Sequence, residues 1–353
     1  MRHMLKILFR KVRRSPGYLI MLAVVVVVAY SILQPGDWNP KHRRGLILHS
    51  SSLELAWQGP DLWLPAAPAV DDKAVYLYYG NSTALVARDL RTGEEFWSHT
   101  STPTTPGEVV GHTFGTTSVL SDGESVYTLT STTASAFSPA TGVEMWSTEL
   151  GGGHVRVVPQ LAPATLRIYY GDTIFDLDPR TGQVVHREDS TTLIWRTQGL
   201  DLVQHPPILL ALESATAREV WRSYIPSLEV STIVPPVDLP DATLAPIETG
   251  HLCRLSLTSG EFEWCTENSP TSNAAAVVGL ARAYLIDDAS QLLSLDLVTG
   301  EATPLAAFPI VEGEAREGSG GPYRNYVAAT PGTIIVYLGD TYQLFALRVI
   351  RPD

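Results

Sequence analysis

The chain has 353 residues, of which 44% are hydrophobic and 18% charged, and this composition excludes an intrinsically disordered protein. Its formal net charge of −12 and isoelectric point near 5.2 argue against nucleic-acid binding, which usually requires a basic surface. The two cysteines are too few for a disulfide scaffold, a cysteine-rich zinc module or an iron–sulfur protein.

The charge is unevenly distributed along the chain. Residues 1–44 contain nine basic residues and one acidic residue, a net charge of +8, whereas the remainder contains 16 basic and 36 acidic residues, a net charge of −20. Six of the basic residues fall within residues 1–17. We interpret residues 1–17 as a basic segment that stays in the cytoplasm, followed by an acidic body.

Residues 18–33 read YLIMLAVVVVVAYSIL and carry no charge. As a helix they rise about 24 Å, so flanking residues are needed to cross a bilayer, and we predict a single transmembrane helix over residues 18–37. Six basic residues precede the span and three follow it, which predicts that the rest of the chain is periplasmic or extracellular. A cleaved signal peptide is the alternative, but no A-x-A site is present. Residues 38–51 are expected to be a linker.

One phrase recurs after residue 50: an apolar strand, Thr-Gly or a close variant, and a short strand that commonly ends in tryptophan. Six copies occur, with their turn glycine or its substitute 35 to 49 residues apart. They are ARDLRTGEEFW (87–97), AFSPATGVEMW (136–146), DLDPRTGQVVH (176–186), ALESATAREVW (211–221), RLSLTSGEFEW (254–264) and SLDLVTGEATP (294–304).

Each phrase predicts a β-hairpin, because glycine supplies the positive φ of the turn and the flanking residues alternate apolar and polar. Two further short strands precede each phrase, which makes four strands per unit. Units of four strands at this period are typical of β-propeller blades. After the span, no long helical pattern is found.

The two ends of this region predict how the ring closes. The last unit, near residues 325–348, lacks a fourth strand, and SLELAWQG (52–59) resembles a fourth strand without its unit, with Trp57 in the tryptophan position. Joining them gives an all-β, seven-bladed propeller over residues 52–350. Closure also removes the sheet edges that would otherwise promote aggregation.

The phrase D-x-x-T-G-x-x-x-W after a V-Y strand resembles the PQQ-like repeat of quinoprotein-type propellers. The resemblance implies the fold more than the function, because such repeats occur in quinone-dependent dehydrogenases, in the propeller lipoprotein of the outer-membrane β-barrel assembly machinery and in sensor ectodomains. It also implies that the tryptophans dock each fourth strand on the neighbouring blade. We assign this structural role to Trp57, Trp97, Trp146, Trp221 and Trp264.

The same resemblance raises the question of a cofactor. The quinoprotein enzymes bind PQQ with calcium near the propeller axis, and many have an adjacent cysteine pair. This chain has no Cys-Cys pair, no calcium-ligand set recognisable by residue type, no histidine spacing typical of zinc, and no nucleophile or phosphate-binding motif. We therefore expect no catalytic residues, no metal and no cofactor.

Cys253 and Cys265 flank the turn at Ser259–Gly260. If residue 257 pairs with residue 262, the cysteines are one residue away from direct opposition, and a β-bulge would bring them into register. A disulfide bond is the interpretation we favour, since the predicted location permits oxidation; two separate thiols are the alternative.

Two long connections, residues 101–116 and 307–324, depart most from the minimal repeat. The second contains Tyr323 and Arg324, which we select as a candidate interaction loop because binding residues commonly lie in such loops. The sequence favours a non-enzymatic extracytoplasmic scaffold or accessory subunit of a membrane-associated complex. Its expected partners are membrane lipid, through the N-terminal helix, and other proteins, but not nucleic acid. The alternatives are a PQQ- or metal-dependent oxidoreductase and a sensor or carbohydrate-binding ectodomain.

Overall fold

The computed structural model divides the chain into two units, Met1–Lys41 and His42–Asp353. It describes residues 43–61, 63–79, 84–100, 118–130, 132–151, 157–161, 164–170, 173–189, 193–205, 207–224, 237–246, 251–266, 276–278, 281–287, 289–312 and 325–350. Within these ranges no helix is long and apolar enough to span a membrane. The predicted span, residues 18–37, lies outside them.

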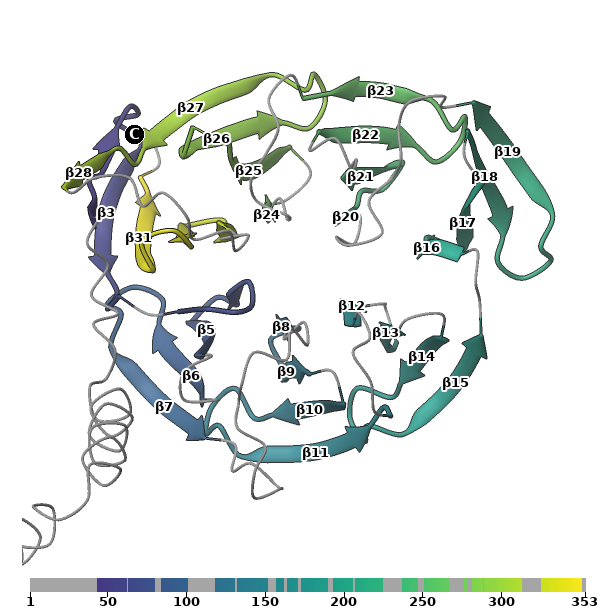
Figure 1. Ribbon diagram of the computed structural model, residues 1–353, viewed down its shortest axis with the longest axis horizontal. Coiled ribbons are helices and arrows are strands. Elements are labelled where there is room, and N and C mark those ends of the chain that lie inside the picture. Colours follow the sequence, from purple (N-terminus) through teal and green to yellow (C-terminus); the bar gives the residue numbers. More distant parts are fainter. Residues whose placement is uncertain are drawn as a thin grey trace, which may run out of the picture. The chain divides into compact units, whose positions relative to one another are not determined.

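The second unit is a seven-bladed β-propeller, as predicted (Figure 1). Blades 1 to 3 consist of β4 (Ala69–Val70), β5 (Ala74–Tyr79), β6 (Ala84–Asp89) and β7 (Glu95–Thr100); β8 (Ser118–Ser121), β9 (Val126–Leu129), β10 (Thr133–Phe137) and β11 (Glu144–Glu149); and β12 (Val157–Leu161), β13 (Leu166–Tyr170), β14 (Thr173–Leu177) and β15 (Val184–Asp189).

Blades 4 to 7 continue around the ring. They consist of β16 (Leu193–Thr197), β17 (Leu200–His205), β18 (Ile208–Glu213) and β19 (Glu219–Tyr224); β20 (Val237–Asp238), β21 (Ala242–Pro246), β22 (Leu252–Ser256) and β23 (Phe262–Cys265); β24 (Ala276–Val278), β25 (Arg282–Ile286), β26 (Gln291–Asp296) and β27 (Ala302–Ala307); and β29 (Tyr326–Thr330), β30 (Thr333–Leu338), β31 (Gln343–Val349) and β3 (Leu53–Gln58).

Each blade is an antiparallel sheet whose first strand lies near the middle of the ring and whose fourth strand lies on the perimeter (Figure 1). In blades 1 to 5 the third and fourth strands shift register by one residue beside the turn, and in blade 6 a shift of one residue lies two residues farther from the turn, between Leu292 and Leu293. This shift is a β-bulge, which increases the local twist of the fourth strand.

The ring closes as the sequence predicted. Strand β3, from the N-terminal part of the unit, pairs antiparallel with β31 and forms the fourth strand of blade 7, with Leu53 opposite Val349 and Gln58 opposite Phe345. Because closure joins strands that are nearly three hundred residues apart, no hairpin turn connects the two outer strands of blade 7.

Two short strands lie within the segment expected to be a linker. Strand β2 (Ile47–Leu48) pairs with β27 as a fifth strand of blade 6, and β1 (Arg43–Arg44) pairs with β28 (Ile310–Glu312). The apolar run at residues 46–48 explains the docking, because Leu46 packs against the buried cluster shared by blades 6 and 7.

The hydrophobic core is divided into layers between neighbouring blades. One layer, for example, joins Tyr127 and Leu129 of blade 2 to Ile168 and Phe175 of blade 3. Apolar side chains therefore occupy both faces of the inner strands, whereas the fourth strands are largely exposed. Contacts between blades accordingly determine the stability of the ring.

Candidate functional site

The tryptophans of the repeated phrase join one blade to the next. Each indole lies on the outer hairpin of the following blade. We call the contact between two neighbouring blades a seam, and at four seams the indole Nε1 donates a hydrogen bond to a backbone carbonyl of that hairpin. The pairs are Trp57 with Leu90 (3.0 Å), Trp97 with Pro139 (2.8 Å), Trp146 with Pro179 (2.9 Å) and Trp221 with Leu257 (2.8 Å). Trp264 occupies the same position against Gly300 of blade 6. We call this arrangement the indole clasp.

The turn glycine beneath each indole is required for two reasons. Gly142, for example, has a φ of +68°, and a β-carbon added there would lie 2.5 Å from Cε3 of Trp97. Positive φ disfavours side chains, and a contact this short leaves no room for a methyl group. The Thr-Gly turn and the tryptophan of the preceding blade therefore form one structural unit.

A tyrosine supports the clasp in blades 1 and 2. The hydroxyl of Tyr76 donates to Asp71 at 2.6 Å, and its ring centroid lies 6.0 Å from that of Trp97; Tyr127, Asp122 and Trp146 repeat the arrangement. Burial first, and the acceptor carboxylate second, raise the pKa of both tyrosines. The V-Y part of the repeat thus serves the blade seam.

Two seams have no indole clasp. Between blades 3 and 4, His186 takes the tryptophan position and Ala217 takes the glycine position, with a φ of +56°. Between blades 6 and 7, Pro304 takes the tryptophan position, and blade 7 has no turn for an indole to cover. The methyl group of Ala217 is tolerated because no indole lies over it.

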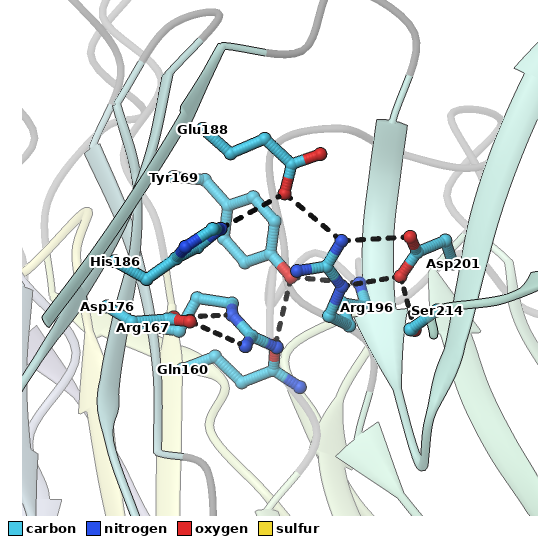
Figure 2. Close-up of polar contacts among 9 residues, drawn as sticks. All are labelled: Gln160, Arg167, Tyr169, Asp176, His186, Glu188, Arg196, Asp201 and Ser214. Carbon is cyan, nitrogen blue, oxygen red and sulfur yellow. Dashed lines mark hydrogen bonds and ion pairs between the residues drawn. The ribbon is translucent and has the colours of Figure 1, made fainter. Parts of the chain in front are cut away.

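A polar network replaces the clasp between blades 3 and 4 (Figure 2). Arg196 of β16 pairs with the carboxylate of Asp201 on β17, its Nη2 lying 2.8 Å from Oδ2, and the same Nη2 lies 3.2 Å from Glu188 on β15 of blade 3. Glu188 in turn lies 3.6 Å from Nε2 of His186, and Ser214 donates to Asp201 at 2.6 Å. The Arg196–Glu188 ion pair therefore crosses the seam.

The buried ring of Tyr169 extends the network into blade 3 (Figure 2). Its hydroxyl accepts the backbone N–H of Arg196 at 2.9 Å and donates to Oε1 of Gln160 at 3.1 Å, and its ring contacts Trp195 edge-on with centroids 4.9 Å apart. Beside it, Arg167 pairs with Asp176 at 2.7 Å across β13 and β14. The seam thus combines an aromatic contact with two arginine–carboxylate pairs.

The charges of this network stabilise one another in their ionised forms. Burial opposes ionisation of Asp201, but hydrogen bonds from Arg196 and Ser214 outweigh it and lower the pKa of that carboxyl. The hydrogen bond to Asp201 raises the pKa of Arg196. Burial raises the pKa of Tyr169, which keeps its hydroxyl a neutral donor. These carboxylates are all engaged with cations, so the network is built to hold two blades together.

The structure joins Cys253 and Cys265 in a disulfide bond across the outer hairpin of blade 5. The bulge between Arg254 and Leu255 places the two cysteines directly opposite each other, where an unbulged hairpin leaves them one residue apart. Cys253 is buried in the layer shared by blades 3, 4 and 5, whereas Cys265 is exposed. The bond therefore lies on the perimeter rather than near the axis.

The described residues contain no group of three or more histidine, cysteine or carboxylate side chains able to hold a metal ion. The two cysteines belong to different strands of blade 5 and are not adjacent in sequence. The candidate interaction residues Tyr323 and Arg324, and the loop at residues 101–116, lie outside the described part of the chain.

An exposed apolar belt follows half of the perimeter, a feature that sequence reasoning missed. It consists of the residue three positions after the turn glycine, or its substitute Ala217, in each of blades 1 to 4. These side chains are 45% to 58% exposed: Phe96, Met145, Val185 and Val220. The equivalent residues of blades 5 and 6 are Glu263 and Thr303, which are polar and exposed. The belt can be found in the sequence by aligning the six phrases on their turn glycines and comparing the hydrophobicity of the residue three positions later.

One protein family matches part of the chain. Residues 42–188, which include β3 and blades 1 to 3, match the PQQ_2 family, described as outer membrane protein assembly factor BamB. The predicted PQQ-like repeat is thereby confirmed. No curated protein matches the chain.

Among solved structures, BamB from Moraxella catarrhalis has a TM-score of 0.48 and 16% identity, with 86% of this chain and 91% of that chain covered. KlHsv2 with loop 6CD replaced by a Gly-Ser linker has a TM-score of 0.49 and 8% identity, with 79% and 90% covered.

Proposed function

We propose that this chain is a membrane-anchored, non-enzymatic scaffold whose propeller binds protein partners on the extracytoplasmic side of the membrane. The apolar belt of blades 1 to 4 carries the proposal. Contiguous exposed apolar surface marks protein-interaction sites, and the belt supplies one large apolar side chain on each of four successive outer strands. The match of residues 42–188 to a family described as an outer membrane assembly factor supports the same class of function.

The architecture suits this role. Layers of buried side chains, indole clasps and the network between blades 3 and 4 hold the fourth strands in fixed positions. A rigid surface loses little conformational entropy when a partner binds, so even a modest apolar area contributes to affinity. The predicted helix at residues 18–37 would keep the scaffold in a membrane-associated complex.

The test uses the internal repeat as its own control. A photo-crosslinking amino acid is placed at Met145 or Val185 of the belt, or at the equivalent positions Glu263 and Thr303, in the full chain in its host membrane. We expect one partner protein to crosslink from the two belt positions and not from the two control positions. Equal crosslinking from all four positions, or none from the belt, would contradict the proposal.

Two further measurements separate this function from its alternatives. Protease added outside an intact cytoplasmic membrane, after any outer barrier has been opened, should digest the propeller, as expected for an extracytoplasmic domain. Purified protein should contain neither stoichiometric quinone absorbance nor bound calcium. Either cofactor at one per chain would favour the oxidoreductase instead.

A further inference from the structure

Residues 43–49, which precede the propeller in the chain, are held on the rim of blade 6. Besides the strand pairs β1–β28 and β2–β27, the backbone N–H of Gly45 donates to the carbonyl of Pro309 at 2.8 Å, and that of His49 donates to Leu305 at 2.8 Å. We call residues 43–49 the strap. Because backbone hydrogen bonds hold it at both ends, the strap does not act as a free linker.

The strap leads directly into blade 7. Only residues 49–52 separate β2 from β3, and this turn is held by a hydrogen bond of 2.6 Å between the hydroxyls of Ser50 and Ser52. The strap therefore bridges the one seam that has neither a tryptophan nor a hairpin turn. Its position on the rim is fixed with respect to both blades.

Four exposed apolar side chains lie on the strap and on the outer strands of blade 7, which follow it in the chain or pair with its continuation. Ile47 and Leu48 on the strap, Leu55 on β3 and Ile350 after β31 are 37% to 50% exposed. Ile350 is tied to the turn by a hydrogen bond from its backbone N–H to Ser52 at 2.7 Å. We call these four residues the rim patch.

The charge beside the rim patch is balanced. Glu54 of β3 lies 2.7 Å from Arg348 of β31, and both side chains are about equally exposed. This pair adds no net negative charge beside the patch, although the chain after residue 44 is acidic as a whole. Apolar side chains without net negative charge suit the headgroup region of a bilayer.

The length of the chain between the predicted span and the strap favours a lipid bilayer as the partner. The predicted span ends at residue 37 and the strap begins at residue 43, so six peptide units join them. Fully extended, they reach about 20 Å. If residues 18–37 span a bilayer, a tether this short, attached at one point of the rim, would keep that part of the rim near the membrane.

We propose that the rim patch lies against the phospholipid headgroups, so that the propeller stands edge-on with blades 6 and 7 toward the bilayer. This inference rests on the anchor in the proposed function. It leaves the belt residues of blades 3 and 4 accessible to protein partners, because β15 and β19 lie across the ring from the strap, whereas β7 of blade 1 lies beside blade 7 (Figure 1). The proposed anchored edge and the blade 3 and blade 4 part of the belt thus lie on opposite sides of the ring.

The experiment compares apolar positions of similar exposure on the two sides of the ring. Single cysteines replace Leu48 or Leu55 of the rim patch, and Met145 or Val185 of the belt, and each is labelled with a nitroxide in the otherwise native, oxidised chain. The full chain is placed in nanodiscs of phosphatidylcholine and phosphatidylglycerol. Electron paramagnetic resonance then measures the accessibility of each label to lipid-soluble oxygen and to a water-soluble nickel chelate.

We expect the oxygen-to-nickel accessibility ratio to be several-fold higher at Leu48→Cys and Leu55→Cys than at the two belt positions. Equal ratios at all four positions in nanodisc-bound protein would overturn the edge-on orientation and leave the anchor intact. A chain that does not co-purify with nanodiscs would instead refute the anchor and, with it, this inference. Circular dichroism of each labelled variant checks that the propeller is folded.

Discussion

The indole clasp predicts that the turn glycine and the preceding tryptophan are energetically coupled. Replacing Gly142 by alanine puts a β-carbon 2.5 Å from Cε3 and 2.7 Å from Cδ2 of Trp97. The indole must move off the turn, which lengthens its hydrogen bond to Pro139. Blade 4 of the native chain has an alanine, Ala217, at the position equivalent to Gly142. Its methyl group is accommodated because His186 stands where the other blades have the tryptophan.

The cost has two separable parts. An alanine at positive φ costs about 1–2 kcal/mol, and forcing a side chain out of a packed position costs about 1–3 kcal/mol more. Gly123→Ala isolates the first part, since Gly123 has a φ of +85° and nothing within 4 Å of its added β-carbon. Gly142→Ala should therefore lower the free energy of unfolding by about 2–5 kcal/mol, and Gly123→Ala by about 1–2 kcal/mol.

A double-mutant cycle with Trp97→His measures the coupling. In that background Gly142→Ala should cost no more than Gly123→Ala does in the native chain, which corresponds to a coupling of about 1–3 kcal/mol. Urea unfolding followed by circular dichroism gives the four free energies of unfolding, provided that their dependence on urea concentration is the same in all four proteins. Equal costs of Gly142→Ala in both backgrounds would refute the clasp as the reason for the glycine.

Three other outcomes follow from the seams and the disulfide. The pKa of Asp201 is lowered in the folded state, so its pairing with Arg196 stabilises the fold above about pH 4, and this stabilisation is lost as the pH falls through the folded-state pKa. The urea concentration at the unfolding midpoint should therefore fall between about pH 5 and pH 3 in the native chain and fall less in Arg196→Met. The same pH dependence in both proteins would contradict a stabilising role of the network. Cys265→Ala removes the disulfide bond and should lower the free energy of unfolding by about 2–3 kcal/mol at neutral pH. The native chain in a reducing agent should lose the same amount. An unchanged free energy of unfolding in both would show that the bond does not stabilise the fold. His49→Pro removes the backbone hydrogen bond to Leu305 of β27 and should speed amide hydrogen exchange in β3 and β31. Leu48→Pro is the control and should not, because the backbone N–H of Leu48 points away from β27. Equal exchange rates in the two variants would show that the strap has no role in closing the ring.

The fold follows from the sequence because its repeated part is local. A Thr-Gly turn with alternating neighbours determines a hairpin without reference to the rest of the chain, and Trp57 on an isolated strand identified how blade 7 closes. The strap was not predicted, since a two-residue strand such as β2 has no periodicity to detect. Its docking depends on the edge of blade 6, which exists only after the blade has formed.

The network between blades 3 and 4 was also beyond sequence reasoning. Arg167 and Asp176, or Arg196 and Asp201, are single charged residues in different strands, and only the strand register brings each pair together. One signal was present: His186 and Ala217 depart from the repeat in successive units. Such paired departures are expected wherever a seam is held by something other than an indole.

Native mass spectrometry of the full chain, extracted from its host membrane in mild detergent, tests the scaffold function most directly. The account predicts a complex of this chain with a protein partner, without a quinone or calcium adduct, and loss of that partner in the variant Met145→Asp with Val185→Asp. A chain that is released alone with a stoichiometric quinone or calcium adduct would contradict it. So would a partner that remains bound when both belt residues carry a charge.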